Sequence, residues 1–428
     1  MERINEPKNY TKEQYTVKNI LNDKFDAGII NYWWATANYG ALLTGYALRQ
    51  VLLKFNRSSR LIDNKSMNIK KDAAYKKTFN HKFAEKYLLT TKACINDTDF
   101  CSLNLQTKIF ITGSDQVFCP KWMKPHFDKY FLNFTDIDAK KIAVSASFGV
   151  NKEELSKNNS EDIIQKMKQS LKSFDLISVR EKSGVEICKD LFDVQAEWII
   201  DPVFILEKIE YDKLIKNASL NFKDKIVSYV LDTNKNYKKA YKYFKNIYNT
   251  DIIETANSDI TAEDWLSSIK NCKFLITDSF HGLCFAIIFN KPFICISNKI
   301  RGAARFESIL EMLGIENQCI SSVDEIYQKD CIFKVDYEKV NQNIEKERQK
   351  GLNFLNRALN LPSGKEKEKT ECRMRYLENL VSDLEKQANL KYQIKKTLWE
   401  LWLIIFHKFL PEPIKNLIRF IRDLGKCK

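Results

Sequence analysis

Short apolar runs alternate along most of the chain with longer stretches in which apolar residues recur every three to four positions. Runs rich in β-branched and aromatic residues predict strands, whereas the three-to-four spacing predicts helices. The predicted strands are 28–34, 108–112, 141–146, 175–179, 196–200, 225–231, 251–255, 273–277 and 292–296. The predicted helices are 41–55, 161–173, 235–248, 261–272, a stretch ending near 290, and 337–360.

Strand–helix alternation is typical of parallel sheets that are covered by helices on both faces. The alternation occurs in two series, so we predict an α/β fold of two Rossmann-like domains facing a cleft, followed by a C-terminal helical tail. The expected parts are a polar extension at 1–25, a first domain at 26–215, a second domain with a return helix at 216–360, and a charged linker with a basic amphipathic helical tail at 361–428.

Composition adds the expected partners and compartment. The 428 residues carry a net charge of +14, which favours acidic partners such as phosphorylated substrates or anionic lipid. The 11 cysteines include no CxxC pair and are typical of a reducing compartment. There is no run of about 18 apolar residues and no apolar signal-peptide core, so we expect a cytoplasmic protein that does not span a bilayer.

The last stretch, 391–428, is unusually basic and carries nine Lys or Arg against three Asp or Glu. Within it, TLWELWLIIFHKFL (397–410) places two tryptophans and several aliphatic residues beside basic ones. This pattern is typical of a helix that lies in a membrane interface, here the inner face of the plasma membrane. A helix packed on the body of the protein or on another subunit remains the alternative.

Polar residues cluster where the predicted strands end, which in an open α/β sheet is the edge that binds ligands. His281, one of only four histidines, lies between a predicted strand and a predicted helix, where free backbone N–H groups favour an anion. Caps, turns and surface ion pairs are the structural alternatives for these positions. The other candidates at strand ends are Asn38, Gly40, Ser114, Asp115, Arg180 and Ser279.

Several familiar signatures are missing from the sequence. There is no GxGxxG motif, no GxxxxGK[ST] motif and no DxD run on a predicted loop. We therefore expect no cofactor and no metal. The basic tail comes without a zinc or RNA-binding pattern, so we expect no nucleic-acid partner.

Six segments follow one another between about residues 26 and 320 in the order of a known family. They are NYGALLTGYALRQVL (38–52), FITGSDQVF (110–118), ISVREKSG (177–184), IIDPVF (199–204), TDSFHGLCFAIIFNKPFI (277–294) and ARFESILEMLGI (304–315). In combination they resemble the polysaccharide pyruvyl transferase family. The resemblance implies a GT-B-like fold and transfer of a pyruvyl group from phosphoenolpyruvate to a sugar of a capsule or exopolysaccharide, giving a ketal or an enol ether, without a metal.

The resemblance also implies residue roles. Arg180 and His281 match the family's basic positions around phosphoenolpyruvate, and Arg305 matches a basic position after the last strand. The arginines would clamp its phosphate and carboxylate, and His281 would protonate its methylene carbon or stabilise the departing phosphate. Asp115 is the expected acceptor of a proton from the sugar hydroxyl. The other expected substrate-binding residues are Ser279, Asn38, Gly40 and Ser114.

One position departs from the family pattern. Characterised members carry Arg-Leu before the histidine, whereas this chain has Ser279-Phe280. One phosphate-binding cation is therefore replaced, and Lys299 or Arg301 is the expected substitute.

The sequence leaves three hypotheses. The first is a pyruvyl transferase that acts on a polysaccharide or a lipid-linked saccharide precursor. The second is a GT-B-type glycosyltransferase that uses a nucleotide sugar and releases a nucleoside diphosphate instead of inorganic phosphate. The third is a non-enzymatic protein that binds a glycan or scaffolds a biosynthetic complex.

Overall fold

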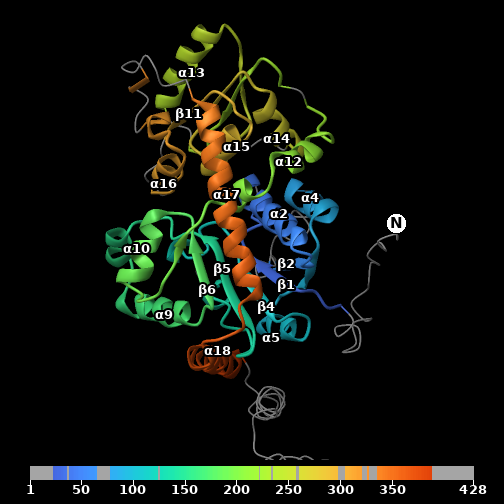
Figure 1. The fold of residues 1–428 in the computed structure, drawn as a ribbon, viewed down its shortest axis with the longest axis vertical. Coiled ribbons are helices and arrows are strands. Elements are labelled where there is room, and N and C mark those ends of the chain that lie inside the picture. The colour runs from blue at the N-terminus through green and yellow to red at the C-terminus, as the bar shows by residue number, and fades with distance from the viewer. Residues whose placement is uncertain are drawn as a thin grey trace, which may run out of the picture. The chain divides into compact units, whose positions relative to one another are not determined.

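In a computed structural model, the chain divides into two compact units, Met1–Cys372 and Arg373–Lys428. Both β-sheets belong to the first unit (Figure 1). The structure describes residues 23–35, 38–64, 78–123, 126–220, 222–232, 235–256, 260–296, 304–320, 325–326 and 335–387.

The first sheet has seven parallel strands in the order β3-β2-β1-β4-β5-β6-β7, the order of a Rossmann sheet with one added strand. Its central strands are buried along their whole length, which explains why they read as continuous apolar runs rather than as alternating patterns. The strands are β1 (Ala27–Ile30), β2 (Ser59–Asp63), β3 (Thr90–Ala93), β4 (Ile109–Thr112), β5 (Lys140–Ala146), β6 (Leu176–Val179) and β7 (Glu197–Trp198).

The second sheet has five parallel strands in the order β12-β11-β10-β8-β9, which is the doubly wound order of a flavodoxin-like sheet. The strands are β8 (Ile226–Tyr229), β9 (Ile252–Glu254), β10 (Phe274–Thr277), β11 (Phe293–Ile296) and β12 (Cys319–Ile320). The predicted α/β fold with two Rossmann-like sheets is therefore confirmed.

The connections between strands carry most of the helices. With the first sheet run α2 (Tyr39–Lys54), α4 (Phe79–Tyr87), α5 (Asp97–Ser102), α6 (Pro120–Met123), α7 (Phe127–Tyr130), α8 (Lys152–Lys157), α9 (Glu161–Lys172) and α10 (Lys182–Asp190). Then follow α11 (Pro202–Ile205), α12 (Lys208–Ile215), α13 (Lys235–Tyr248), α14 (Ala262–Asn271), α15 (Phe280–Ile288) and α16 (Ala304–Leu313). Short 3₁₀ turns occupy Leu103–Leu105 and Glu316–Gln318.

Two of these helices are buried on nearly every side. In α2 and α15 almost all residues are inaccessible to solvent, because each helix packs against its own sheet and against the other helix. This environment explains their high apolar content around the whole circumference. Since α2 belongs to the first sheet and α15 to the second, their contact joins the two halves of the first unit.

The long helix α17 (Tyr337–Asn360) also joins the two halves, and Figure 1 shows it running from the second sheet to the first. The Tyr337 hydroxyl donates to the carbonyl of Lys291 beside β11. Near the other end, Nζ of Lys140 in β5 donates to the carbonyl of Leu359 (2.7 Å). The predicted helix 337–360 is confirmed at both ends, and α18 (Glu366–Gln387) follows it.

Some boundaries differ from the predictions. The predicted strand 28–34 ends at Ile30, because the side chain of Asn31 accepts a hydrogen bond from the N–H of Trp33 (3.0 Å) and turns the chain. Strands β2, β3 and β12 had not been predicted.

Among the described residues, no helix is long and apolar enough to cross a membrane. The predicted tail helix at 391–428 lies outside the described residues.

Candidate active site

The candidate residues come from the carboxyl ends of strands in both sheets. Asp115 follows β4, Arg180 follows β6, and Asp201 follows β7 as the N-cap of α11. From the second sheet, His281 lies in the first turn of α15, directly after β10. Arg305 lies in the first turn of α16.

Arg180 is the centre of the cluster. Its Nη1 donates to Oδ2 of Asp201 (2.7 Å) and to Oγ of Ser114 (3.3 Å), and its Nη2 donates to Oδ1 of Asp115 (3.3 Å). The Ser114 hydroxyl also donates to Oδ2 of Asp201 (2.7 Å). The Arg180 side chain is only 1% exposed. A buried guanidinium needs such partners, since an uncompensated charge in the interior is costly.

Asp115 has an unusual backbone, with a φ angle of +103°. Side chains rarely adopt this conformation, which costs about 1–3 kcal/mol and is characteristic of functional sites. A bridge to Ala146 at the end of β5 keeps the backbone in place. Although burial opposes ionisation, the charges of Arg180, His281 and Arg305 lower the pKa of Asp115 below its usual value. Asp115 is therefore ionised at neutral pH, and its carboxylate can accept hydrogen bonds.

His281 packs against the start of α2. Its Nε2 lies 3.0 Å from Oγ1 of Thr44 and 3.8 Å from Oδ2 of Asp201. A Cβ atom at Gly40 would come within 2.0 Å of the imidazole Nδ1, so only glycine leaves room for this ring. Burial would raise the pKa of Asp201, but the hydrogen-bonding effect of His281 and the charge of Arg180 hold it well below its usual range.

The Phe280 ring lies close to two buried arginines. The guanidinium of Arg180 lies 4.4 Å from the centre of the Phe280 ring, and that of Arg305 lies 5.5 Å from it. Burial and the positive charge of Arg180 lower the pKa of Arg305 to about 10, which still leaves it charged at neutral pH. Arg305 is thus a second buried cation next to Phe280. The expected substitutes Lys299 and Arg301 lie outside the described residues.

Glu181 had not been predicted as a site residue, although it directly follows Arg180. Burial raises its pKa, despite the opposing charge of Arg180 and a hydrogen bond from Ser147. Its Oε1 also accepts a bond from the N–H of Gly149 (3.1 Å), whereas Oε2 has no hydrogen-bond partner in the described part of the chain. Thr44, Phe280 and Asp201 had likewise not been assigned to the site, although each lies in one of the segments that resemble the family.

Other predicted residues have structural contacts here. Asn38 caps α2 by accepting a bond from the N–H of Ala41 (3.0 Å), and Ser279 caps α15 by accepting one from Gly282 (3.4 Å). Ser114 is fully buried and is bonded only within the Arg180 cluster. The structure therefore places these three beside the site, and their contact with a substrate stays a prediction.

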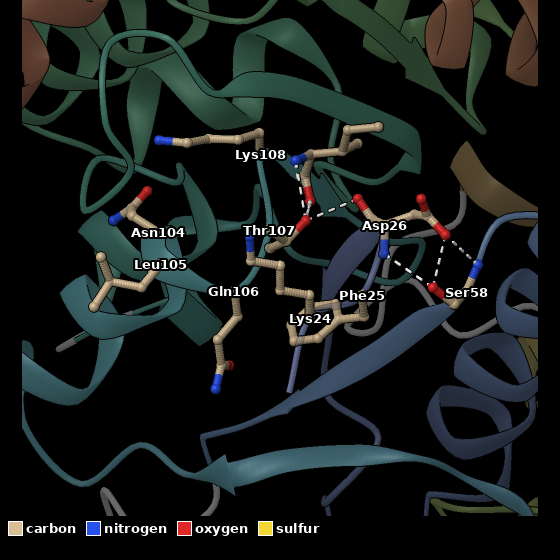
Figure 2. Close-up of a pocket in the computed structure, with 10 residues that line it drawn as sticks. Lys24, Phe25, Asp26, Ser58, Asn104, Leu105, Gln106, Thr107 and Lys108 are labelled. Carbon is tan, nitrogen blue, oxygen red and sulfur yellow. Dashed lines mark hydrogen bonds between the residues drawn. The ribbon is translucent and has the colours of Figure 1, made fainter. Parts of the chain in front are cut away.

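A separate pocket of about 480 Å³ opens at the opposite edge of the first sheet, where β1 and β4 begin (Figure 2). Its polar groups largely bond one another. The Ser58 hydroxyl donates to Oδ2 of Asp26 (2.6 Å), and the Thr107 hydroxyl donates to the Asp26 carbonyl (2.8 Å). None of the candidate residues lines it, so the cluster at the carboxyl ends remains the candidate active site.

Within the described residues, no group of three or more His, Cys, Asp or Glu could hold a metal ion.

Comparison with solved structures finds proteins of similar chain course at low identity. They include UDP-GlcNAc 2-epimerase from Methanocaldococcus jannaschii (12% identity, TM-score 0.41, 75% of this chain and 92% of that one). A variant of the wall teichoic acid polymerase TagF is similar at 11% identity (TM-score 0.36, 86% and 92%). A mutant O-GlcNAc transferase from Thermobaculum terrenum is similar at 9% identity (TM-score 0.36, 83% and 68%). No curated protein matches the chain.

A family profile gives a more definite result. The polysaccharide pyruvyl transferase profile matches residues 38–300, which is more than half of the chain. The matched range includes Asp115, Arg180, Asp201 and His281 and ends just before Arg305. This chain therefore belongs to the polysaccharide pyruvyl transferase family and is a polysaccharide-modifying transferase.

Proposed function

We propose that this protein transfers a pyruvyl group from phosphoenolpyruvate to a sugar hydroxyl of a polysaccharide or of its precursor. The observation that carries the proposal is the grouping of two buried cations, Arg180 and Arg305, around Phe280 beside an ionised carboxylate, Asp115. The two cations suit a donor with two anionic groups, and the carboxylate suits an acceptor that must lose a proton. The family assignment favours this donor over a nucleotide sugar.

On the donor side, the phosphate and carboxylate of phosphoenolpyruvate would bind near Arg180, Arg305 and the N-terminus of α15. Free N–H groups in the first turn of a helix favour an anion. Arg180 already bonds Asp115 and Asp201, so its main contribution is a fixed positive field. Arg305, whose guanidinium also lies next to the Phe280 ring, is proposed to contact the donor directly.

The chemical step needs a general acid and a general base. Protonated His281 would give a proton to the C3 methylene of the donor, while the sugar oxygen forms a bond to C2. The hydroxyl proton passes to Asp115. Cleavage of the bond between C2 and the phosphate oxygen then releases inorganic phosphate and leaves an oxocarbenium ion. A second hydroxyl of the sugar adds to C2 and loses its proton to give a ketal, or C3 loses a proton to give an enol ether. Acid–base catalysis of this kind contributes about 10²–10⁴-fold, so His281→Ala should lower kcat by that factor.

Calorimetric titration with phosphoenolpyruvate tests the donor, with UDP and GDP sugars run alongside. We expect binding by the wild type that weakens at least about tenfold in Arg305→Gln, which corresponds to about 1.4 kcal/mol. Arg57→Ala is the matched control, because Arg57 pairs with Asp26 at the opposite sheet edge. Binding of a nucleotide sugar without binding of phosphoenolpyruvate would overturn the proposal in favour of a glycosyltransferase.

We further propose that residues 391–428 hold the enzyme at an anionic membrane surface on the cytoplasmic side, close to a lipid-linked acceptor. The support is the excess of basic residues beside two tryptophans in that segment.

A further inference from the structure

A group of aromatic and amide side chains lies next to Asp115, on the side of the first sheet formed by β1, β2 and β4. Tyr32 and Trp34 follow β1, and Asn64 directly follows β2. Tyr130 ends α7, and its carbonyl accepts a bond from the Thr112 hydroxyl at the end of β4 (2.7 Å). Because these strands are neighbours in a parallel sheet, their carboxyl ends bring the four side chains to one edge.

The four side chains contact one another. The Tyr32 and Tyr130 rings are 4.7 Å apart, and Tyr32 meets Trp34 edge-on at 6.5 Å. Nδ2 of Asn64 donates to the Tyr130 hydroxyl (3.2 Å). Burial is the main cause of the raised pKa of both tyrosines, and the charge of Asp115 adds to it. Asp115 therefore lies within electrostatic reach of this group as well as of Arg180.

Several polar atoms in this group lack a partner. Within the described residues, the hydroxyl of Tyr32, Nε1 of Trp34 and Oδ1 of Asn64 are buried and have no partner in hydrogen-bonding geometry, although the Tyr130 hydroxyl lies near the first two. Asn64 is only 1% exposed, so its carbonyl oxygen is deeply placed. A buried polar atom without a partner costs free energy, and such atoms in a native site point to a missing ligand or water.

The chemistry of the group differs from that of the donor side. It offers two hydrogen-bond donors, one amide acceptor and aromatic faces, but no charged side chain. Aromatic rings with polar edges suit a ligand that has an apolar face and a polar rim. A sugar ring has both, since its C–H bonds form the face and its hydroxyls form the rim.

We propose that Tyr32, Trp34 and Asn64 form the subsite for the acceptor sugar and that this sugar is a neutral saccharide. This inference rests on the proposed function. In this proposal Arg180, Arg305 and His281 serve the donor, and the aromatic group serves the acceptor. The Asp115 carboxylate is common to both, because it bonds Arg180 and its charge reaches Tyr32 and Tyr130. A hydroxyl of a sugar held by the aromatic group would then lie beside the carboxylate that takes its proton.

The test uses the full chain and a panel of methyl glycosides of glucose, galactose, mannose and their N-acetylamino forms, followed by saturation-transfer NMR. Tyr32→Phe removes one polar atom without a hydrogen-bonding partner and keeps the ring, whereas Trp34→Phe removes the indole N–H with part of the ring and keeps a smaller aromatic face. Each should weaken binding of the preferred glycoside about three- to tenfold. Thermal stability of Tyr32→Phe should be unchanged or slightly higher, because no protein hydrogen bond is lost. Tyr243→Phe, on α13 of the other half, is the matched control.

The outcomes separate this subsite from the donor proposal. Phosphoenolpyruvate binding, measured by calorimetry on the same variants, should be unchanged. Equal glycoside binding by wild type and both variants would overturn the subsite, as would absence of saturable binding of every neutral glycoside to the wild type. Glycoside binding that depends on Tyr32 and Trp34, with no phosphoenolpyruvate binding, would leave the subsite standing and overturn the donor.

Discussion

Asp115 connects strain, charge and chemistry in one residue. Its φ of +103° is unfavourable for any side chain, and only the surrounding bridge and ion pair keep it there. A position selected for stability alone would be glycine. A strained backbone of this kind is common at functional sites, so we predict that the Asp115 carboxylate contributes to activity.

The strain can be measured by comparing two substitutions of Asp115. Asp115→Ala and Asp115→Gly both remove the carboxylate and its bond to Arg180, so we expect both to lose transfer activity. Only glycine relieves the backbone, so Asp115→Gly should be more stable than Asp115→Ala by about 1–2 kcal/mol in urea unfolding. Equal stability of the two variants would contradict the strained conformation.

Asp201 bonds Arg180 and Ser114, and its ionisation should make the stability of the protein depend on pH. Asp201→Asn leaves buried Arg180 with one fewer carboxylate, which should cost about 3–5 kcal/mol at pH 7. The pKa of Asp201 is lowered in the folded protein, so its contribution is fully present above the unfolded pKa of about 3.9 and declines as the pH falls below it.

The measurement is urea unfolding of wild type and Asp201→Asn at about pH 7 and about pH 3. The stability difference between the two proteins should shrink at the lower pH. A difference that stays constant across this range would show that the Asp201 carboxylate is not stabilised by Arg180 and His281.

The site residues that were predicted from the sequence lie just after strands or at the start of helices, whereas Thr44, in the interior of a helix, was not predicted. Arg180, Asp115, His281 and Arg305 follow strands or begin helices, and the structure brings all four together. Thr44 lies one turn inside α2 and meets His281 across 237 positions of sequence. No local pattern indicates such a contact, because it depends on how two helices pack.

At the scale of elements, the contact between α2 and α15 sets the position of His281, the proposed proton donor. Helix α2 follows β1 and helix α15 follows β10. A Cβ atom at Gly40, in the first turn of α2, would come within 2.0 Å of the His281 ring in the first turn of α15. The sequence predicted both helices from their apolar content. It did not predict that they touch, since apolar residues surround each helix on all sides and indicate no preferred partner.

The prediction for this junction is that Gly40→Ala displaces the His281 ring. An added Cβ would lie 2.3 Å from Cγ of the imidazole, so the ring or the helix must shift. We expect kcat to fall at least about tenfold, since misplacement of a catalytic group by about 1 Å can cost about 100-fold. Inorganic phosphate release measures this effect.

Gly28→Ala is the control for this substitution. Gly28 is also buried in the first half, but a Cβ there would meet its nearest neighbour at 3.5 Å, an ordinary contact. It should retain activity close to that of the wild type. Full activity in Gly40→Ala would contradict a role for this close approach in positioning His281.

Strand prediction depended on how deeply each strand is buried. The central strands β1, β4, β5 and β10 each contain a run of apolar residues and were predicted from the sequence. The missed strands are SRLID, TTKA and the two-residue β12, which are short or polar. Two of them, β3 and β12, lie at sheet edges, where one side has no neighbouring strand and polar residues are tolerated.

At the scale of the whole molecule, the candidate site depends on both sheets. Asp115, Arg180 and Asp201 come from the first sheet, whereas His281 and Arg305 follow strands of the second. The contact of α2 with α15 and the long helix α17 hold the two halves together. This division explains why the family segments extend along most of the chain: neither half alone carries both the acid and the base.

The last prediction concerns the basic segment 391–428, which lies outside the family match and within the second compact unit. Each basic residue near an anionic surface contributes about 1 kcal/mol, so nine of them beside two tryptophans should give stable binding. Full-length protein should sediment with vesicles that contain phosphatidylglycerol and much less with pure phosphatidylcholine. High salt should release it, because screening shortens the reach of the charges to about 3 Å at 1 M. A chain ending at residue 390 should lose vesicle binding and keep phosphoenolpyruvate binding, since Arg180, His281 and Arg305 are unaffected. Equal sedimentation of the full and shortened chains would show that the segment does not hold the enzyme at a membrane.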